Sequence, residues 1–213
     1  MLLYLARHAQ TASSAVDSFN GRRDLPLTEA GREQARKLGQ RLAGARFAAV
    51  YRSPLGRTAE TARLIAPSLE ARVLEGLTEI DYGQWEGLSA RDAEALDPRR
   101  YAAWVADPAA VPPPGGETAG QVASRATAAL REILSRHEAT GLPALAISHK
   151  ATLRILAAAL TGAPVSGYRV RWGQDECALN LVELRSGKEP FLRLWNDTSH
   201  LGADPGATTR GGK

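Results

Sequence analysis

Short apolar runs alternate with longer helical patterns along most of this chain, and this alternation limits the folds that it can adopt. The apolar runs at 2–5, 47–51 and 144–147 have the length of buried strands. Between the first two, about 28–43 carries an apolar stripe at helical spacing, with Thr28 as its N-cap. Strands that alternate with helices form a mainly parallel sheet covered on both faces. We therefore predict an α/β fold, a single three-layer domain with helices on both faces of a central sheet.

The remaining elements complete this fold. Further helices are predicted over about 56–65, 118–136 and 151–160, with strands over 73–74, 178–184 and 191–194. The last two strands are expected to pair around Ser186-Gly187. Prolines break the segment at about 88–116 into short helices, for which we predict a small helical cap over the carboxyl ends of the strands. The domain is expected to cover 1–201, and 202–213, rich in Gly, Thr and Pro, is expected to be a disordered tail.

Composition narrows the class of protein. The chain has 213 residues, 44% of them hydrophobic, which is enough for a substantial core. It contains no run of about 18 uncharged apolar residues, so we expect no transmembrane helix and no membrane partner. The single cysteine, Cys177, excludes an internal disulfide and fits a reducing compartment. These observations predict a cytoplasmic protein. Cys177 is expected to be an inert side chain packed in the core.

Charge gives little support for a nucleic-acid partner. The formal net charge is +4, and the pI is near 9.5. Lys occurs only at 37, 150, 188 and 213, and the Arg residues are scattered among Glu, so no polybasic tract is present. We therefore expect no nucleic-acid binding. The basic balance would still attract small anionic substrates.

Two apolar strands each end in a histidine beside a cation. The first delivers Arg7-His8, and the strand at 144–147 is followed by Ser148, His149 and Lys150. Loops at the carboxyl ends of strands in open α/β sheets bind ligands. Arg offers a positive fork for phosphate, and a neutral imidazole can act as a nucleophile. The two strands together predict one anion-binding pocket.

Three further segments can be joined to these histidines. Arg57 lies in the first turn of a helix that follows a strand, where free N–H groups suit phosphate. Glu79 lies in a loop dense in Gly and aromatic residues, which can hold an acid in a partly dry place. The long first loop contains Asn20, Gly21 and Arg22, where a lid or substrate contact would lie. The carboxylates that compete with Glu79 for the role of catalytic acid are Glu75, Asp81 and Glu86.

Several motifs, in order, resemble one family. The run Arg7-His8-Ala9-Gln10-Thr11 resembles the Arg-His-Gly-Glu/Gln-Thr signature of the histidine phosphatase superfamily, also called the phosphoglycerate mutase-like family. Later segments resemble further segments of that family in the family's order: 24–31, 53–58, 79–87, 115–118, 148–149 and 196–201. The resemblance covers roughly residues 2–201. It implies the fold predicted above and a small bacterial phosphatase.

The resemblance also implies a mechanism. His8 would attack phosphorus and form a phosphohistidine, which requires a neutral imidazole. Arg7, Arg57 and His149 would surround the phosphoryl oxygens, and Glu79 would protonate the leaving alcohol and then activate water. Fixed cations would take the place of a metal, so neither metal nor cofactor is expected. The substrate-binding residues would be Gln10, Thr11, Asn20, Gly21, Arg22 and Lys150.

Three positions depart from the family pattern. Ala9 replaces the usual Gly, and Lys150 stands where Gly often follows the second His. The Lys150 ammonium would either reach a second acidic group of the substrate or point to solvent. The Asn that the family carries soon after its signature is missing from 12–15, and Asn20 is offset from that position. These departures concern the substrate contacts more than the chemistry.

The branch of the family and the substrate stay open. A cofactor-dependent phosphoglycerate mutase is the main alternative, but the short interval at 87–148 and its compact 112–116 turn favour a phosphatase. A phosphate-binding module without turnover is a further alternative. Expected partners are a small-molecule phosphomonoester and, if any, a second copy of the chain, which leaves a monomer or a homodimer. Candidate substrates are phosphoserine, α-ribazole phosphate, phosphorylated sugar acids and a broad set of small monoesters.

Three residues outside the motifs also receive predictions. His137 ends a polar helix and is expected to face solvent. His200 could fold over the pocket from the end of the domain. Among the tryptophans, Trp104 is the best candidate for a wall of the pocket.

Overall fold

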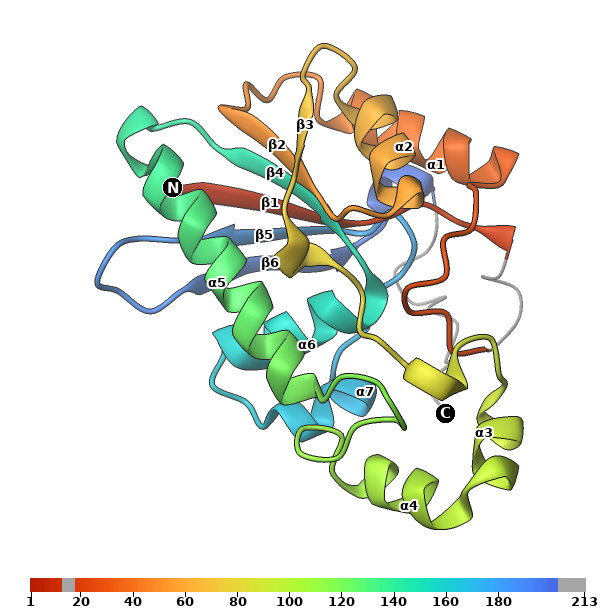
Figure 1. The fold of residues 1–213 in the computed structure, drawn as a ribbon. Helices are drawn as coiled ribbons and strands as arrows, with labels where there is room; N and C mark the ends of the chain where they lie inside the picture. Colours follow the sequence, from red (N-terminus) through yellow and green to blue (C-terminus); the bar gives the residue numbers. More distant parts are fainter. Residues whose placement is uncertain (13–17, 203–213) are drawn as a thin grey trace.

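The sheet has six strands in the order β3-β2-β4-β1-β5-β6 (Figure 1). The computed structural model describes residues 1–12 and 18–202. The pairs β3–β2, β2–β4 and β4–β1 are parallel, and β1–β5 and β5–β6 are antiparallel, which confirms the predicted mainly parallel sheet. The strands are β1 (Leu2–Arg7), β2 (Ala49–Arg52), β3 (Ala71–Val73), β4 (Ala144–Ser148), β5 (Leu179–Glu183) and β6 (Phe191–Asp197).

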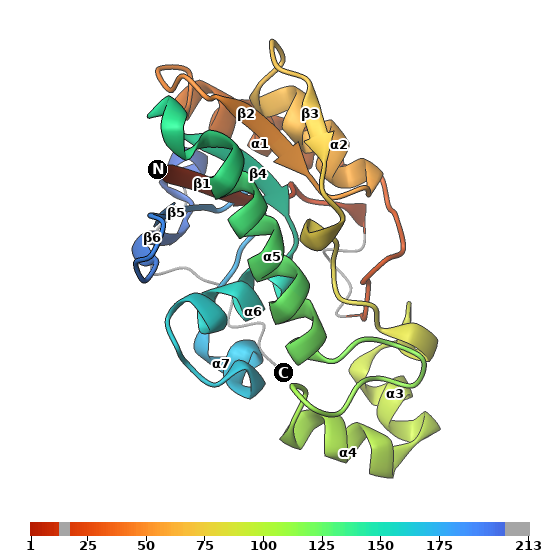
Figure 2. The ribbon, with the colours of Figure 1, turned by 60° about the vertical axis from the view of Figure 1, so that its left-hand side comes forward.

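Alternate side chains of the central strands pack into two separate cores. In β1, Leu3 and Leu5 join the core beneath α5 (Ala119–His137), whereas Tyr4 and Ala6 join the core beneath α1 (Glu29–Arg41) and α2 (Gly56–Ile65). Figures 1 and 2 show α5 and α6 on one side of the sheet and α1 and α2 on the other. Burial on both faces therefore produces the predicted three layers.

Local signals place the helix boundaries close to those predicted. Thr28 accepts a hydrogen bond from the N–H of Gly31 and begins α1. Thr118 and Gln121 form a capping box at the start of α5. The helix α6 (Lys150–Leu160) follows β4 after the single residue His149, whose side chain does not cap it. Shorter elements are α7 (Tyr168–Arg171) and the 3₁₀ turns η2 (Glu75–Leu77), η3 (Gly83–Trp85), η4 (Glu138–Thr140), η5 (Val165–Gly167) and η6 (Ser199–Leu201).

Two short helices, α3 (Ala90–Leu96) and α4 (Pro98–Ala106), lie at one end of the molecule, away from the sheet (Figures 1 and 2). Asp97 ends α3 and caps α4, with Pro98 in the first turn of α4. The pair rests on a small aromatic core containing Trp85 and Trp104. The proline-broken helical segment that the sequence predicts is therefore present.

The prediction that His137 faces solvent is wrong. Its side chain is buried, and its Nε2 lies 2.9 Å from the hydroxyl of Tyr51 in the sheet. The reason is the stripe of α5 that packs on the sheet: Ala126, Leu130, Ile133 and His137 repeat at helical spacing. Burial, followed by the charges of nearby arginines, lowers the pKa of His137.

Two predictions concern the limits of the chain. No helix among the residues that the structure describes is long and apolar enough to cross a membrane. The predicted tail, 202–213, lies outside the described residues except for Gly202.

Replacing Tyr51 by Phe tests the buried Tyr51–His137 contact. The change removes the hydroxyl and leaves a ring nitrogen of His137 without its partner, so the free energy of unfolding should fall by about 1–2 kcal/mol. Urea unfolding at pH 7.5 measures this change. Tyr4→Phe is the matched control, because no hydrogen bond involves the Tyr4 hydroxyl among the described residues. Equal effects of the two substitutions would contradict the importance of this contact.

Candidate active site

His8 and His149 meet because their strands are neighbours in register. Arg7 in β1 pairs with Ser148 in β4, so the residue that follows each strand reaches the same edge of the sheet. The two imidazole centroids lie 5.2 Å apart, at an interplanar angle of 58°. His8 is 7% exposed, and His149 is fully buried. The two strands therefore bring their histidines together at one edge of the sheet, and the anion-binding role predicted for them stays a prediction.

The backbone fixes the tautomer of His8. Its Nδ1 lies 2.8 Å from the carbonyl oxygen of Ala9, which can only accept a hydrogen bond. Nδ1 therefore carries the proton, and in the neutral ring Nε2 keeps its lone pair. Ala9 is itself anchored, because its N–H donates to the Thr61 hydroxyl at 3.1 Å. Among the described residues, no hydrogen bond is recorded at Nε2 of His8.

Both imidazoles are held neutral by their surroundings. Burial lowers the pKa of His8 well below 6.5, and the charges of Arg7 and Arg57 lower it further. Burial is also the main cause of the lowered pKa of His149, followed by the charge of Arg57. Near pH 7, the site therefore contains two uncharged imidazoles beside permanent cations.

Arg57, buried in the first turn of α2, holds the long first loop against the site. Its Nη1 and Nη2 donate to the carbonyl oxygens of Arg23 and Gly21, each at 2.6 Å. Its Nε donates to Nδ1 of His149 at 3.3 Å. Asp24 accepts a hydrogen bond from the N–H of Arg57 at the start of α2, with its carboxylate 3.7 Å from Nη1.

A hydroxyl relay that the sequence analysis missed orients His149. Nε2 of His149 lies 2.7 Å from Oγ of Ser53, which lies 3.0 Å from Oγ1 of Thr58. Because Nδ1 accepts from Arg57, Nε2 is the nitrogen that donates to Ser53. The signal in the sequence was the pair of hydroxyl residues on either side of Arg57.

Arg7 leaves β1 toward the loop that precedes β5. Its Nη1 donates to the carbonyl oxygen of Gln174 at 2.8 Å, and its Nη2 pairs with Glu176 at 3.3 Å. Its Nε is buried without a hydrogen-bond partner among the described residues. At least one N–H of this guanidinium is therefore unused by the described residues.

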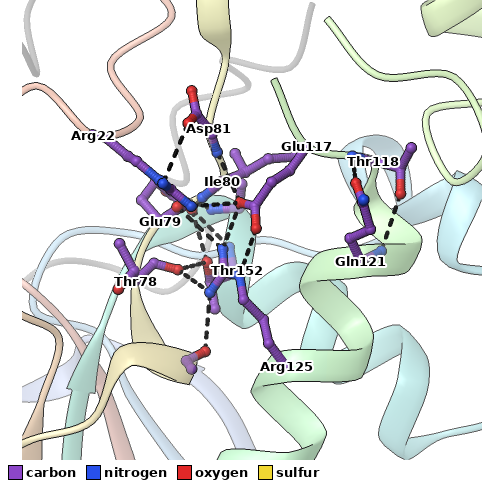
Figure 3. Close-up of polar contacts among 12 residues, drawn as sticks. Arg22, Thr78, Glu79, Ile80, Asp81, Glu117, Thr118, Gln121, Arg125 and Thr152 are labelled. Carbon is purple, nitrogen blue, oxygen red and sulfur yellow. Dashed lines mark hydrogen bonds and ion pairs between the residues drawn. The ribbon is translucent and has the colours of Figure 1, made fainter. Parts of the chain in front are cut away.

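Glu79 lies at the start of α6 (Figure 3). Its Oε1 accepts hydrogen bonds from the N–H of Ile80 and from both the N–H and the hydroxyl of Thr152, at 2.9 to 3.0 Å. Within residues 1–12 and 18–202, its Oε2 accepts only from the N–H of Ala151, at 3.0 Å. The Glu79 carboxylate thus caps the start of α6, which the side chain of His149 does not. Of its two oxygens, Oε2 accepts fewer hydrogen bonds and has more room to accept another.

The three rival carboxylates have other positions. Glu75 is exposed at the start of η2, and Asp81 pairs with Arg22 at 3.3 Å. Glu86 organises the first loop instead of facing His149. Its carboxylate accepts hydrogen bonds from the backbone N–H groups of Gly21, Arg22, Arg23 and Tyr82.

Arg125 on α5 supports the Glu79 loop from behind, which the sequence analysis did not foresee. Its guanidinium donates to the carbonyl oxygens of Thr78 and Glu79, at 2.6 and 3.1 Å, and pairs with Glu117 at 3.0 Å (Figure 3). The side chain of Arg22 pairs with Glu117 from the other side, at 3.3 Å. A lone arginine inside an amphipathic helix offers no local signal for this long-range role.

The predicted substrate residues are distributed over several loops. The side-chain oxygen of Gln10 accepts from the Thr28 hydroxyl at 2.8 Å, and Thr11 bridges Leu27, so both residues shape the first loop. Asn20 donates to the carbonyl oxygen of Ser18. The contacts of Gly21 and Arg22 are those given above, and Lys150 is half-buried as the first residue of α6.

Three other features lie around this centre. His200 packs with η6 against α1, where the charges of Arg41 and Asp197 act on it. Trp104 is buried in the aromatic core below α3 and α4. Cys177 is fully buried, which raises its pKa to about 12 and fits the packing role expected for it.

Within residues 1–12 and 18–202, no three His, Cys, Asp or Glu side chains are grouped to hold a metal ion.

Comparison with known proteins agrees with this geometry. The family model described as "Histidine phosphatase superfamily (branch 1)" matches residues 3–198. Phosphoserine phosphatase 1 of Hydrogenobacter thermophilus is 31% identical over 94% of each chain. A 2,3-bisphosphoglycerate-dependent phosphoglycerate mutase of a Methylobacterium species is 38% identical over 76% of this chain and 81% of its own. The solved structure of Bacillus stearothermophilus YhfR superposes with a TM-score of 0.85, at 31% identity, over 94% of this chain and 98% of its own. The chain therefore belongs to branch 1 of the histidine phosphatase superfamily.

Proposed function

We propose that this protein is a metal-independent phosphatase that hydrolyses small acidic phosphomonoesters through a phosphohistidine at His8. The observation that carries this proposal is the state of the His8 ring. Its Nδ1 proton is committed to Ala9, its Nε2 lone pair is available, and burial between two guanidinium groups keeps the ring neutral. A nucleophile of this kind needs an electron-poor acceptor, and a phosphoryl group surrounded by cations is one.

The reaction has two in-line displacements at phosphorus. In the first, Nε2 of His8 bonds to phosphorus while the bond from phosphorus to the alcohol oxygen breaks, and Glu79 gives that oxygen a proton. In the second, a water oxygen bonds to phosphorus, Glu79 takes a proton from the water, and the bond between phosphorus and nitrogen breaks. Inorganic phosphate leaves, and His8 and Glu79 return to their starting states. The freer oxygen of Glu79, Oε2, is the one that carries the proton.

Fixed donors stabilise the charge that develops. Arg7 contributes its unused Nε–H, and Arg57 contributes its charged guanidinium. The role proposed for His149 is to hold Arg57 in place beside His8, because both of its ring nitrogens are already hydrogen-bonded, to Arg57 and to Ser53. Contacts to the rest of the substrate are assigned to Gln10, Thr11, Asn20, Gly21, Arg22 and Lys150. Their support is their placement on the first loop and at the start of α6.

The domain organisation belongs to the same proposal. The catalytic domain covers residues 1–201, and the 88–116 segment with α3 and α4 acts as a cap over the site.

A phosphoglycerate mutase is the second candidate, because one of the relatives carries that name. The phosphatase is favoured because a phosphatase relative aligns over a larger share of this chain, 94% against 76%. Conversion of 3-phosphoglycerate to its 2-isomer would support the mutase instead.

Substrate and location extend the proposal further. Phosphoserine is the first substrate to test, because the relative that aligns over 94% of each chain is named a phosphoserine phosphatase. The lone buried cysteine fits the reducing environment of the cytoplasm. We assign the protein there, as a monomer or homodimer that acts on a free small molecule.

The first test is phosphate release from phosphoserine, sugar phosphates, 3-phosphoglycerate and p-nitrophenyl phosphate in the presence of EDTA. The wild type should release phosphate from at least one ester, because fixed cations supply the charge stabilisation. His8→Ala should lose at least about 10³-fold in kcat/KM, since the nucleophile is gone. Loss of activity in EDTA, or activity that survives in His8→Ala, would contradict the proposed mechanism.

Glu79→Gln separates proton donation from binding. Alkyl esters such as phosphoserine have a basic leaving group and should lose about 10²- to 10⁴-fold in kcat. p-Nitrophenyl phosphate has a leaving group that departs without a proton, so its first step should lose much less. Single-turnover kinetics of both esters measure this difference. Equal losses for the two esters would show that Glu79 does not act as the acid.

The lowered pKa of His8 predicts a dependence of stability on pH. Unfolding returns His8 to an ordinary pKa of about 6.5, so the unfolded chain binds more protons than the folded chain below that pH. The free energy of unfolding should therefore be fully retained above about pH 6.5 and should fall as the pH drops from there toward the lowered value. Urea unfolding between pH 8 and 5, compared for wild type and His8→Gln, measures how much His8 contributes to the pH dependence of the free energy of unfolding. An equal slope in the two proteins would contradict a neutral buried His8.

A further inference from the structure

Two guanidinium groups near the proposed reaction centre have no acidic partner. Within residues 1–12 and 18–202, neither Arg154 on α6 nor Arg169 on α7 forms an ion pair. By contrast, Arg7, Arg57 and Arg125 each have a carboxylate within 4.0 Å. Arg154 and Arg169 therefore form a cationic pair that the described part of the chain does not neutralise.

The two side chains are held in place by contacts that leave most of their N–H groups unused. Nε of Arg154 donates to the carbonyl oxygen of Tyr168 at 3.1 Å, which places Arg154 against α7. The guanidinium of Arg169 lies over the ring of Trp104 on α4, 4.1 Å from the ring centroid. Stacking of this kind uses the face of the guanidinium and leaves its edge free for a planar anion. The pair thus joins α6, α7 and α4.

A continuous aromatic wall connects this pair to the loop that carries Glu79. The ring of Phe19 lies 5.5 Å from Trp104 and 4.8 Å from Tyr82, measured between centroids. Tyr82 is three residues beyond Glu79, and the charges of Glu79 and Arg169 both act on its hydroxyl. The cationic pair therefore borders the same region as the proposed catalytic acid.

The charge in this region is positive. Burial lowers the pKa of Arg154, and the like charges of Arg169 and Arg7 lower it further, although the nearby tyrosines act in the opposite direction. Arg154 and Arg169 are only partly buried, so a ligand can reach the N–H groups that the protein leaves unused. A carboxylate there would supply the missing negative charge and accept charge-assisted hydrogen bonds.

On this basis, and resting on the proposed function, we propose that Arg154 and Arg169 form a carboxylate subsite that selects phosphomonoesters bearing a carboxylate. The phosphoryl group would lie at His8, and the carboxylate would lie at the free edges of the two guanidinium groups, where a bidentate arrangement is available. Phosphorylated hydroxy acids and amino acids meet this requirement. Esters of simple alcohols and neutral sugars do not.

The test is a binding comparison in the His8→Ala background, where no turnover occurs. Phosphoserine and phosphoethanolamine are the matched probes, because they differ only in the carboxylate. Calorimetry should show phosphoserine binding at least about tenfold more tightly, the size of one hydrogen-bonded charge pair. Arg169→Gln should remove most of this preference, and Arg154→Lys should reduce it.

Arg171→Gln is the matched control, because Arg171 is an exposed arginine on the same short helix. It should leave the tenfold preference in place, and thermal unfolding of each variant should show that the fold is retained. The proposal is overturned if the two probes bind equally or not at all, if Arg169→Gln keeps the full preference, or if Arg171→Gln removes it. Phosphate release by the wild type is measured separately. A protein that prefers phosphoserine but hydrolyses nothing would refute the proposed function and leave the subsite standing.

Discussion

The parallel pairing of β1 with β4 is the constraint on which the site depends. Because Arg7 and Ser148 are opposite each other, the two histidines that follow them emerge at the same height of the sheet edge. A shift of the register by one residue would turn every side chain of one strand to the other face and would separate His8 from His149. The two cores, which interdigitate with alternate residues of the same strands, hold that register.

Around His8 and His149, acidic and basic side chains have different tasks. The acidic side chains hold the backbone of loops and helix starts in place, and the arginines supply positive charge to the site. Asp24, Glu79 and Glu86 each accept several backbone N–H groups, so their charges hold loops and helix starts in place. Arg7 and Arg57 each donate to backbone carbonyl oxygens; Arg57 also donates to His149, and Arg7 keeps an Nε–H that has no partner among the described residues. The result is a preorganised positive centre with neutral imidazoles, which suits a phosphoryl group more than a neutral ligand.

The sequence was sufficient for the fold and for the residues grouped at the sheet edge, because both follow from local patterns. Strand and helix periodicity located the elements, and the ordered motifs located His8, Arg57, Glu79 and His149. It was insufficient where a role depends on contacts between distant segments. Arg125 supports the Glu79 loop across 46 positions of the chain, and the exposure of His137 was mispredicted because the stripe of α5 extends one turn further than its polar end suggested.

The stereochemical course at phosphorus tests the central claim most directly. Each in-line displacement inverts the configuration, so transfer to His8 followed by transfer to water must give overall retention. The probe is a thiophosphate monoester whose non-bridging oxygens are the two heavy oxygen isotopes. Its hydrolysis in ordinary water yields inorganic thiophosphate that carries sulfur and three different oxygen isotopes on phosphorus, and the configuration of this product reports the outcome. Retention is the result that the account predicts. Inversion would mean that water attacks the ester directly, and it would contradict the covalent role of His8.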